Sequence, residues 1–284
     1  MDLTNISEIK GLLARHGFHF SKSLGQNFLV DASVVRRIAE GSGADKNCGV
    51  LEIGTGIGVL TKELSALAGK VVAIELDKRL PDLLAESLGG CGNVEILSGD
   101  VLKTDLPALA AEKFPGLRPM VCANLPYNIT TPVLSALIEA NCFSAMTVMI
   151  QREVARRICA APGTADYGAF SIYVNYYTQP EILFDVPPGC FIPQPKVTSS
   201  VIRLTRRDAP PCPVSDEKLF FRLVRASFAQ RRKTLVNGLQ SAVGERYSKA
   251  ELADLLEDLG FPAAVRGETL SISDFARITD RIHG

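Results

Sequence analysis

The chain has 284 residues, of which 46% are hydrophobic and 22% charged, and its 31 Lys and Arg residues are matched by 31 Asp and Glu residues. These proportions exclude intrinsic disorder, and the length predicts one large domain followed by a small one. No apolar run approaches the roughly 20 residues that span a membrane, and no secretory signal opens the chain, so we expect a cytoplasmic protein. Zero net charge, taken alone, argues against a nucleic-acid partner.

Cysteines and histidines indicate neither a metal site nor a nucleophilic catalytic centre. The seven cysteines are scattered without a Cys-x-x-Cys pair, and only three histidines are present. Zinc sites and Cys-His or Ser-His-Asp centres need such residues in close sets. We therefore expect reduced thiols and no bound metal.

Short β-branched or apolar runs predict five buried strands, at residues 50–53, 70–75, 94–97, 120–123 and 146–150. After the first strand, Ile57, Leu60, Leu64 and Leu67 recur at helical spacing, and residues 77–88 predict a second helix. Strands that alternate with helices favour a parallel sheet covered on both faces.

The rest of the chain has a different pattern. Residues 169–205 combine a Tyr- and Val-rich run, a loop punctuated by prolines and a strand at residues 200–204, which predicts an antiparallel edge pair. A proline-rich linker at residues 209–213 precedes three mainly helical stretches, at residues 219–243, 249–259 and 273–282. We therefore predict a domain over residues 1–208 and a small helical domain over residues 209–284.

A glycine-rich loop, Glu-Ile-Gly-Thr-Gly-Ile-Gly, occupies residues 52–58 directly after the first strong strand. An α/β sheet binds nucleotide-like ligands at this position. The dinucleotide fingerprint is not met, because Val59 stands where its third glycine belongs, and no Gly-Lys-Ser/Thr follows to make a phosphate loop. Glu52 would repel a pyrophosphate but suits an ammonium group such as that of a methionine moiety. Gly54 and Gly56 are expected to hold that moiety.

Two further carboxylates follow neighbouring strands. Glu75 ends the second strand, from which it can accept both hydroxyl hydrogens of a ribose. Asp100 follows the third strand and can reach an adenine. Either residue alone would be read as a helix cap. Together with Glu52 and the glycine loop they favour S-adenosylmethionine over NAD or ATP.

The fourth strand leads into Asn124-Leu125-Pro126-Tyr127. The amide oxygen of Asn124 and the backbone carbonyl of Leu125 can each accept a hydrogen from an exocyclic nucleobase amine, which aims its nitrogen lone pair at a methyl donor. Pro126 stiffens this turn. Tyr127 offers one aromatic face for a base removed from its stack, and Phe191 is the expected second face. Alone, the tetrapeptide would predict only a turn with a buried aromatic ring.

These residues also carry a family resemblance. The chain resembles, nearly end to end, the KsgA family of ribosomal RNA small-subunit adenine dimethyltransferases. The match rests on residues 23–29 (Ser-Leu-Gly-Gln-Asn-Phe-Leu), the glycine loop, Asn-Leu-Pro-Tyr with its following Ile-Thr-Thr-Pro, and residues 149–155, 191–197 and 230–234. Thr130 stands where relatives often have Ser, and Gly267 where Ala is commoner.

The resemblance implies a class I SAM-dependent methyltransferase fold, Rossmann-like with a mostly parallel sheet and an antiparallel edge, plus a small all-α C-terminal domain. It implies transfer of four methyl groups to the N6 amines of two adjacent adenosines in a hairpin loop near the 3′ end of small-subunit rRNA, within an immature 30S particle. It also implies cofactor contacts at the matching positions, namely Asn27, Leu29, Gly54, Glu75, Asp100 and Asn124.

The neutral total conceals a segregated charge distribution. Residues 41–150 carry eight basic and twelve acidic side chains, whereas residues 196–236 carry ten basic and three acidic ones. A charge run is usually a solvated surface, but this one adjoins the expected base clamp, so we predict a contact with the RNA backbone. The residues expected to make it are Lys196, Arg222, Arg225, Arg231, Arg232 and Lys233. Arg36 and Arg37, with Lys22 upstream, are expected to extend this contact.

Two other functions compete with this interpretation. Methylases of large-subunit rRNA that confer macrolide resistance share the chemistry, but they more often have Ile after the Asn of the acceptor motif. A ribosome-assembly factor that has lost catalysis belongs to another class, and the intact cofactor loop and acceptor motif argue against it. Nothing in the sequence demands more than a monomer.

Overall fold

The structure, a computed structural model, describes residues 1–21, 25–230 and 232–284. These residues form two compact units, each described here by itself. The first unit comprises Met1–Ala155 and Glu181–Arg206, and the second comprises Arg156–Pro180 and Arg207–Gly284. No helix in the described part of the chain is both long and apolar enough to cross a membrane.

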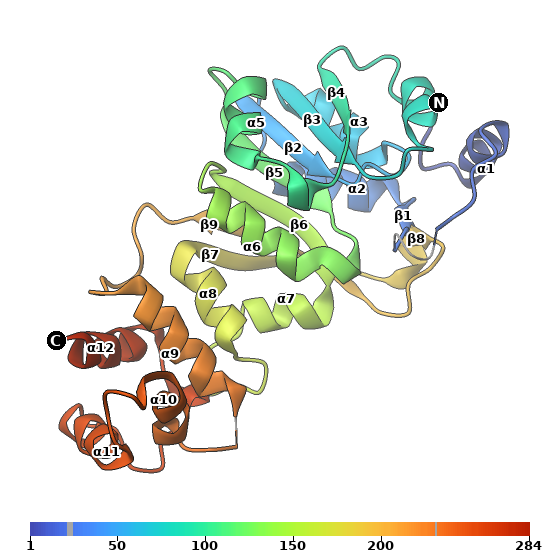
Figure 1. The fold of residues 1–284 in the computed structure, drawn as a ribbon. Coiled ribbons are helices and arrows are strands. Elements are labelled where there is room, and N and C mark those ends of the chain that lie inside the picture. Colours follow the sequence, from blue (N-terminus) through green and yellow to red (C-terminus); the bar gives the residue numbers. More distant parts are fainter. Residues whose placement is uncertain (22–24, 231) are drawn as a thin grey trace. The chain divides into compact units, whose positions relative to one another are not determined.

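A seven-stranded sheet with the order β4-β3-β2-β5-β6-β9-β7 is the centre of the fold (Figure 1). Its strands are β2 (Cys48–Ile53), β3 (Lys70–Glu75), β4 (Val94–Ser98), β5 (Arg118–Asn124), β6 (Ala145–Gln151), β7 (Thr178–Val186) and β9 (Ser199–Arg206). Neighbours from β4 to β6 pair in parallel, and β9 lies antiparallel to β6. A separate two-stranded antiparallel sheet joins β1 (Phe28–Leu29) to β8 (Phe191–Ile192).

The strand order reverses at β2, and this reversal determines where a crevice for a ligand opens. The chain passes from β2 outward through β3 to β4, and then returns to β5 on the other side of β2. The loops that leave β2 and β5 therefore diverge at the carboxyl edge of the sheet, and a crevice opens between them.

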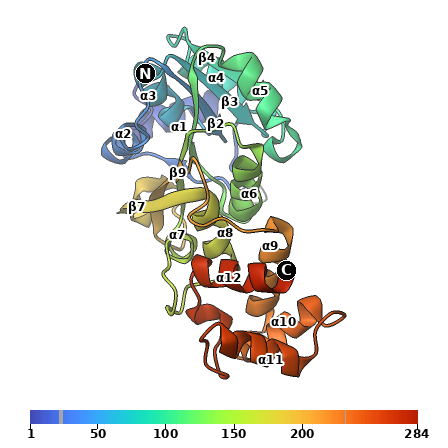
Figure 2. The same cartoon turned by 90° about the vertical axis from the view of Figure 1, so that its left-hand side faces the viewer.

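Helices cover both faces of this sheet. Figure 2 shows α2 (Ala32–Gly41) and α3 (Val59–Leu67) on one face and α5 (Leu106–Lys113) and α6 (Thr130–Ala140) on the other. Helix α3 carries Leu60 and Leu64 one turn apart, and both are buried, as the apolar periodicity predicts. The helices before β7 are α1 (Ile6–Arg15), α2 (Ala32–Gly41), α3 (Val59–Leu67), α4 (Pro81–Ser87), α5 (Leu106–Lys113), α6 (Thr130–Ala140), α7 (Arg152–Ile158) and α8 (Ala169–Tyr177).

The second unit is built from α8 and four later helices. These are α9 (Glu217–Ala229), α10 (Leu235–Val243), α11 (Lys249–Asp258) and α12 (Ile272–His283). Helices α9 and α10 pack closely because Gly238 has no side chain: a Cβ there would lie 2.8 Å from the Cα of Ser227. The stretch predicted as helical over residues 219–243 is thus two helices, separated by non-helical backbone at Gln230 and Thr234.

The five predicted strands are confirmed, but residues 169–177 differ from the prediction. This Tyr- and Val-rich run forms helix α8, and the edge strand is β7, which follows it. Tertiary packing overrides β propensity here, since Tyr176 lies 5.2 Å, ring centroid to centroid, from both Phe220 and Phe221 of α9. The same packing groups residues 156–180 with the C-terminal helices, so the units differ from the predicted division near residue 208.

Candidate functional site

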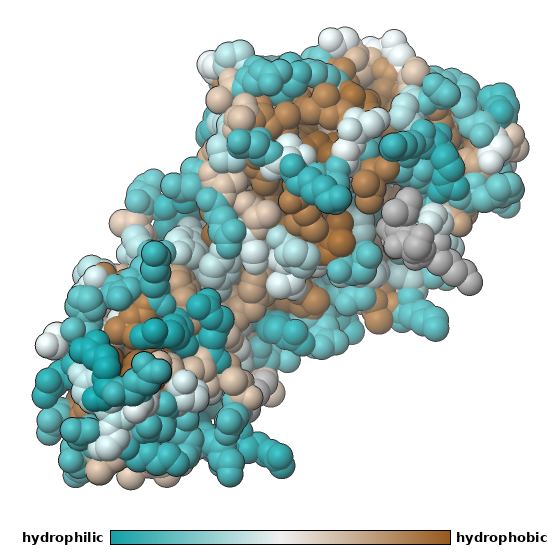
Figure 3. All heavy atoms as spheres, in the orientation of Figure 1, coloured by the Kyte–Doolittle hydropathy of each residue, from teal (hydrophilic) through white to brown (hydrophobic). Residues whose placement is uncertain are grey.

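A cavity of about 220 Å³ opens in the first unit where β2, β3, β4 and β5 end. On the face shown in Figure 3, hydrophobic side chains gather in the upper part of the view and hydrophilic ones border them. Five chain segments line the cavity: residues 25–29, the glycine loop, the end of β3, the end of β4, and the turn after β5. All of the residues predicted to bind the cofactor lie in this lining, namely Asn27, Leu29, Glu52, Gly54, Gly56, Glu75, Asp100 and Asn124.

The glycine loop has a backbone that other residues adopt poorly. Gly56 has φ 54° and Gly58 has φ 87°, both in the left-handed region. A Cβ on Gly56 would lie 3.0 Å from Cδ1 of Phe28. The chain therefore makes its tight turn above β2 only because a side chain is absent there, and the loop backbone remains open to a ligand.

Replacing Gly56 by Ala should lower the free energy of unfolding by about 1–2 kcal/mol, the cost of a left-handed backbone at a residue with a Cβ. Affinity for S-adenosylmethionine should fall as well, because Phe28 must move. Urea unfolding and calorimetric titration measure the two effects. Gly92→Ala is the matched control, since a Cβ at Gly92 meets no atom within 4 Å. Equal effects in both variants would show that the loop geometry is not the cause.

Glu75 is held rigidly at the end of β3. Its Oε2 accepts hydrogen bonds from the backbone N of Thr55 at 2.9 Å and from the Thr55 hydroxyl at 3.0 Å. Its Oε1 accepts from the backbone N of Asp77 at 2.9 Å. An ionised carboxylate has about four acceptor positions. Three are occupied, so Glu75 is fixed in place and retains capacity for a ligand hydroxyl.

Asp100 acts as a helix cap and lines the cavity at the same time. Its Oδ1 accepts from the backbone N of Leu102 at 3.0 Å and caps the short 3-10 helix Val101–Lys103. No described residue donates to its Oδ2. The two interpretations offered by the sequence, a cap or a ligand contact, are therefore compatible.

Glu52 is a buried acid without a cation beside it. Its exposed fraction is 1%, and its Oε2 has no hydrogen-bond partner among the residues that the structure describes. Burial raises the pKa of this carboxyl to about 8; the Thr61 hydroxyl opposes the rise, and the negative charge of Glu75 adds to it. At neutral pH the side chain is thus protonated, whereas the sequence led us to expect a carboxylate. A ligand ammonium group would supply the missing partner.

The turn after β5 presents two oxygen atoms. The side-chain Nδ2 of Asn124 donates to the backbone O of Asn27 at 3.3 Å, an assignment that directs its Oδ1 away from that bond. The backbone N of Leu125 donates to the O of Met149 at 3.1 Å, while no described residue donates to the Leu125 carbonyl. Both acceptors needed for an amine are therefore available.

Tyr127 lines the same cavity, and its orientation is fixed from β9. Its hydroxyl and that of Ser199 lie 2.6 Å apart, and Ser199 is fully buried. Burial raises the pKa of Tyr127, and the bond to Ser199 lowers it. Sequence reasoning missed Ser199, because a serine 72 positions away carries no local signal for this contact.

Phe191 does not line the cavity. Its exposed fraction is 1%, and it pairs with Leu29 in the small β1–β8 sheet. The aromatic ring is in the hydrophobic core because β8 is tied to the segment before α2. The two-sided aromatic clamp expected from the sequence is therefore not formed in this conformation.

The basic residues are distributed over both units. Exposed Lys196 belongs to the first, and the second contains exposed Arg222, Arg225, Arg232 and Lys233. Arg231, Lys22 and two residues of the 23–29 motif, Ser23 and Leu24, lie outside the described residues. On α9, Lys218, Arg222 and Arg225 follow at steps of four and three and so share one exposed face.

Arg203, which also belongs to the basic region of the sequence, is paired within the sheet. Its Nη2 lies 2.9 Å from Oε2 of Glu181 on β7. Its charge is thereby largely compensated. The basic face of α9 is the better candidate for a phosphate contact.

Comparison with known proteins identifies one family. The sequence model described as ribosomal RNA adenine dimethylase matches residues 17–280. Ribosomal RNA small subunit methyltransferase A of Geobacillus thermodenitrificans is 47% identical over 284 residues, which cover 99% of this chain and 97% of the relative. The protein of the same name from Shouchella clausii is 46% identical and covers 99% and 96%, respectively.

Two solved structures are similar over most of their length. A dimethyladenosine transferase from Plasmodium falciparum superimposes with a TM-score of 0.74 and 27% identity, covering 88% of this chain and 95% of that one. The 23S rRNA methyltransferase ErmE gives a TM-score of 0.70 and 26% identity, covering 91% and 100%.

Proposed function

The chain belongs to the ribosomal RNA adenine dimethylase family, and from this premise we propose its full reaction. It dimethylates adenines of small-subunit rRNA and uses S-adenosylmethionine as methyl donor. In our proposal the targets are two adjacent adenosines in the 3′-terminal hairpin loop, and each receives two methyl groups at N6. The fold is the class I methyltransferase fold predicted from the sequence.

The cavity of the first unit suits this cofactor. Gly54 and Gly56 leave the loop backbone accessible, and Glu75 and Asp100 retain acceptor oxygens for the nucleoside. Oε2 of Glu52, which has no partner among the described residues, suits an ammonium group. Asn27, Leu29 and Asn124 complete the set of proposed contacts. When bound, S-adenosylmethionine supplies an electrophilic methyl group on a sulfonium centre.

The residues of the chain activate the acceptor by positioning it. The N6 amine of adenine is a weak nucleophile because its lone pair is delocalised into the ring. Oδ1 of Asn124 and the carbonyl oxygen of Leu125 each accept one of its hydrogens, which holds the nitrogen in a more tetrahedral geometry and fixes its direction. No strong base is required. This pair of available oxygens beside the cofactor cavity is the observation that carries the proposal.

Tyr127 provides the face on which the extruded adenine stacks, and Ser199 holds its ring in place. Phe191 completes the clamp only after the β1–β8 pair has rearranged, because its ring is buried. In this proposal Phe191 becomes the second face of the clamp when that rearrangement exposes its ring.

The test of the proposed reaction is methyl transfer from labelled S-adenosylmethionine to 30S subunits that lack the modification. Digestion of the rRNA and mapping should locate dimethyladenosine at two neighbouring positions near the 3′ end. Incubation with 50S rRNA is the parallel assay, since the similarity to ErmE makes large-subunit rRNA the competing substrate. The identity of 47% to small-subunit enzymes favours the first outcome. Modification confined to 50S rRNA would refute it.

The basic face of α9 is proposed as an RNA contact, together with Arg232, Lys233 and, on the first unit, Lys196. The partner is rRNA within an immature 30S particle, engaged by a monomer in the cytoplasm. Arg231 remains a sequence-based member of this set. An exposed cation contributes to RNA affinity mainly by releasing counterions from phosphates.

Replacing both Arg222 and Arg225 by Ala should reduce the salt dependence of 30S binding. We expect the slope of log K against log salt concentration to fall in magnitude by about 1 for each arginine. Binding measured by filter retention between low and physiological salt provides this slope. A variant with Lys10→Ala and Lys103→Ala removes the same charge from exposed positions in the first unit. If this control changes the slope as much, the α9 face has no special role.

A further inference from the structure

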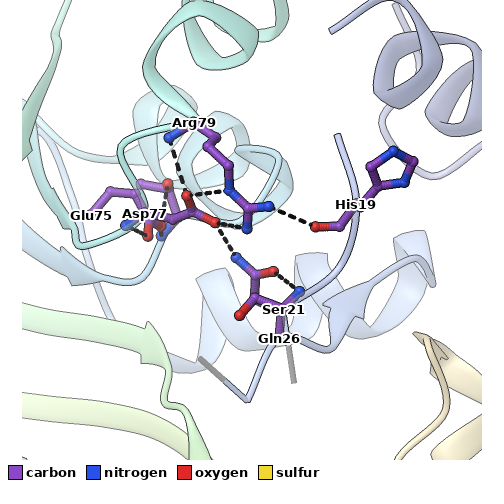
Figure 4. Close-up of polar contacts among 7 residues, drawn as sticks. His19, Ser21, Gln26, Glu75, Asp77 and Arg79 are labelled. Carbon is purple, nitrogen blue, oxygen red and sulfur yellow. Dashed lines mark hydrogen bonds and ion pairs between the residues drawn. The ribbon is translucent and has the colours of Figure 1, made fainter. Parts of the chain in front are cut away.

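A polar network connects the segment before α2 to the turn after β3 (Figure 4). The side-chain Nε2 of Gln26 donates to Oδ2 of Asp77 at 2.7 Å, and the backbone N of Ser21 donates to Oε1 of Gln26 at 2.8 Å. Arg79 donates to Asp77 from Nε at 2.8 Å and from Nη2 at 2.6 Å, and from Nη1 to the backbone O of His19 at 3.0 Å. We call Gln26, Asp77 and Arg79 the latch.

The latch is a strong interaction. Asp77 is only 5% exposed, and it accepts from the Arg79 guanidinium in a two-pronged arrangement. The hydrogen bond from Arg79 is the largest of the influences that hold the pKa of Asp77 at about 2. The carboxylate is therefore ionised at every pH at which ribosomes assemble, and the network does not depend on pH in that range.

Residues 25–29, here called the strap, connect the latch to the proposed cofactor site, because they include Gln26 and line the cavity. The strap lines the cavity, and Asn27 and Leu29 within it are proposed cofactor contacts. The Phe28 ring lies 5.7 Å from Phe18 and 5.0 Å from Phe20, centroid to centroid, and rests against Gly56. Gln26 is thus a member of the latch and also part of the cavity wall, directly before Asn27.

At its other end the latch contacts Glu75, the carboxylate proposed to bind the ribose of the cofactor. The backbone N of Asp77 donates to Oε1 of Glu75 at 2.9 Å. On the acceptor side, the strap is tied by the bond from Asn124 to the O of Asn27. One short segment is therefore held between the cofactor wall at β3 and the acceptor turn after β5.

We propose that Gln26, Asp77 and Arg79 are positioning residues that preorganise the strap for S-adenosylmethionine. This proposal rests on the proposed role of the cavity as the cofactor site. Asp77 and Arg79 lie outside the cavity lining and hold the strap through Gln26. The latch orders the strap before the cofactor binds, so that the cofactor does not have to impose this order at the expense of affinity. Its loss raises the KM for the cofactor and leaves kcat nearly unchanged.

The test compares three variants of the full chain. Gln26→Met keeps the side-chain length and removes both hydrogen bonds of this side chain, the one to Asp77 and the one from the backbone N of Ser21. Asp77→Asn and Arg79→Gln remove the charge-assisted pair. Each should weaken S-adenosylmethionine binding about tenfold, the size expected for hydrogen bonds to a charged group. Gln26→Met combined with Asp77→Asn should lose less affinity than the sum of the two single losses, because the bond between Gln26 and Asp77 contributes to both.

Arg15→Gln is the matched control. Arg15 pairs with Glu86, elsewhere in the first unit, and is not part of the cavity lining. The affinity of the Arg15→Gln variant for S-adenosylmethionine should equal that of the unmodified chain. A merely structural role of the latch would lower the unfolding free energy without a selective rise in the cofactor KM. If Asp77→Asn fails to fold, the partly exposed Gln26 still provides the test.

Calorimetric titration with S-adenosylmethionine alone separates this proposal from the proposed function. If the unmodified chain binds the cofactor but methylates no rRNA, the proposed reaction fails and the latch remains testable. Cofactor affinity within twofold of the unmodified chain in folded Gln26→Met and Arg79→Gln overturns the latch. A fall in kcat with an unchanged cofactor KM overturns it as well.

Discussion

Replacing Asn124 by Ala should reduce methyl transfer to 30S rRNA by about a hundredfold to a thousandfold, the range found when one oriented hydrogen-bond partner is removed from an active site. Oδ1 of Asn124 is one of only two acceptors proposed to hold the amine, so its loss leaves the nitrogen free to rotate. Cofactor binding should weaken far less, because most of the cavity lining is unchanged. Single-turnover transfer of a labelled methyl group and calorimetric titration measure the two quantities.

Asn47→Ala is the control for this prediction. It makes the same truncation at an exposed turn before β2, away from the cavity lining. A second variant, Asn124→Asp, retains an acceptor oxygen but loses the donation to the Asn27 carbonyl. We expect it to lose transfer as well. Normal turnover in Asn124→Ala would remove the central step of the proposed mechanism.

Replacing Glu52 by Gln should have the largest effect on pH dependence. In the unmodified chain the folded state keeps a proton on Glu52 up to a pKa of about 8, while the unfolded chain releases it near 4.5. Between these two pH values the folded state binds more protons than the unfolded state. The free energy of unfolding therefore falls as the pH rises through this window. Glu52→Gln has no proton to lose at this position, so its free energy of unfolding should not show this fall. Relative to the unmodified chain, the variant should become more stable as the pH rises through the window.

The same substitution should remove a proton release that accompanies cofactor binding. An ammonium group placed beside Glu52 favours its ionised form, so binding of S-adenosylmethionine at pH 7 should release a proton. Calorimetry in buffers of different ionisation enthalpy measures this release. The Gln variant should release none and bind about tenfold more weakly. Glu40→Gln, which changes an exposed carboxyl of α2 outside the cavity lining, is the control, and its proton release on binding should equal that of the unmodified chain. Undiminished proton release in Glu52→Gln would contradict the assignment.

Much of the fold could be predicted because the signals were local. Each of the five strands is a short apolar run, and the residues at their carboxyl ends meet at one sheet edge whatever the details of packing. Glu75 and Asp100 could be placed in the cavity on this argument alone. Helix α8 could not, since Tyr173, Tyr176 and Tyr177 have β propensity and become helical by packing on Phe220 and Phe221.

Features that depend on distant contacts or on burial were outside the reach of sequence reasoning. Nothing near Glu52 in the sequence reveals that the side chain is almost completely enclosed, and enclosure is what protonates it. The burial of Phe191 likewise follows from pairing with Leu29, which lies 162 positions earlier. The bond from Gln26 to Asp77 also joins residues 51 positions apart, whose proximity only the fold determines.

The second unit is assembled from two separate stretches of chain, residues 156–180 and residues 207–284. A stop codon near residue 206 would remove α9 and leave Tyr176, now 1% exposed, without Phe220 and Phe221. The helical unit is for this reason an insertion combined with a tail, and no single truncation separates it from the sheet. Gene fusions and exchanges between relatives will have to transfer both stretches together.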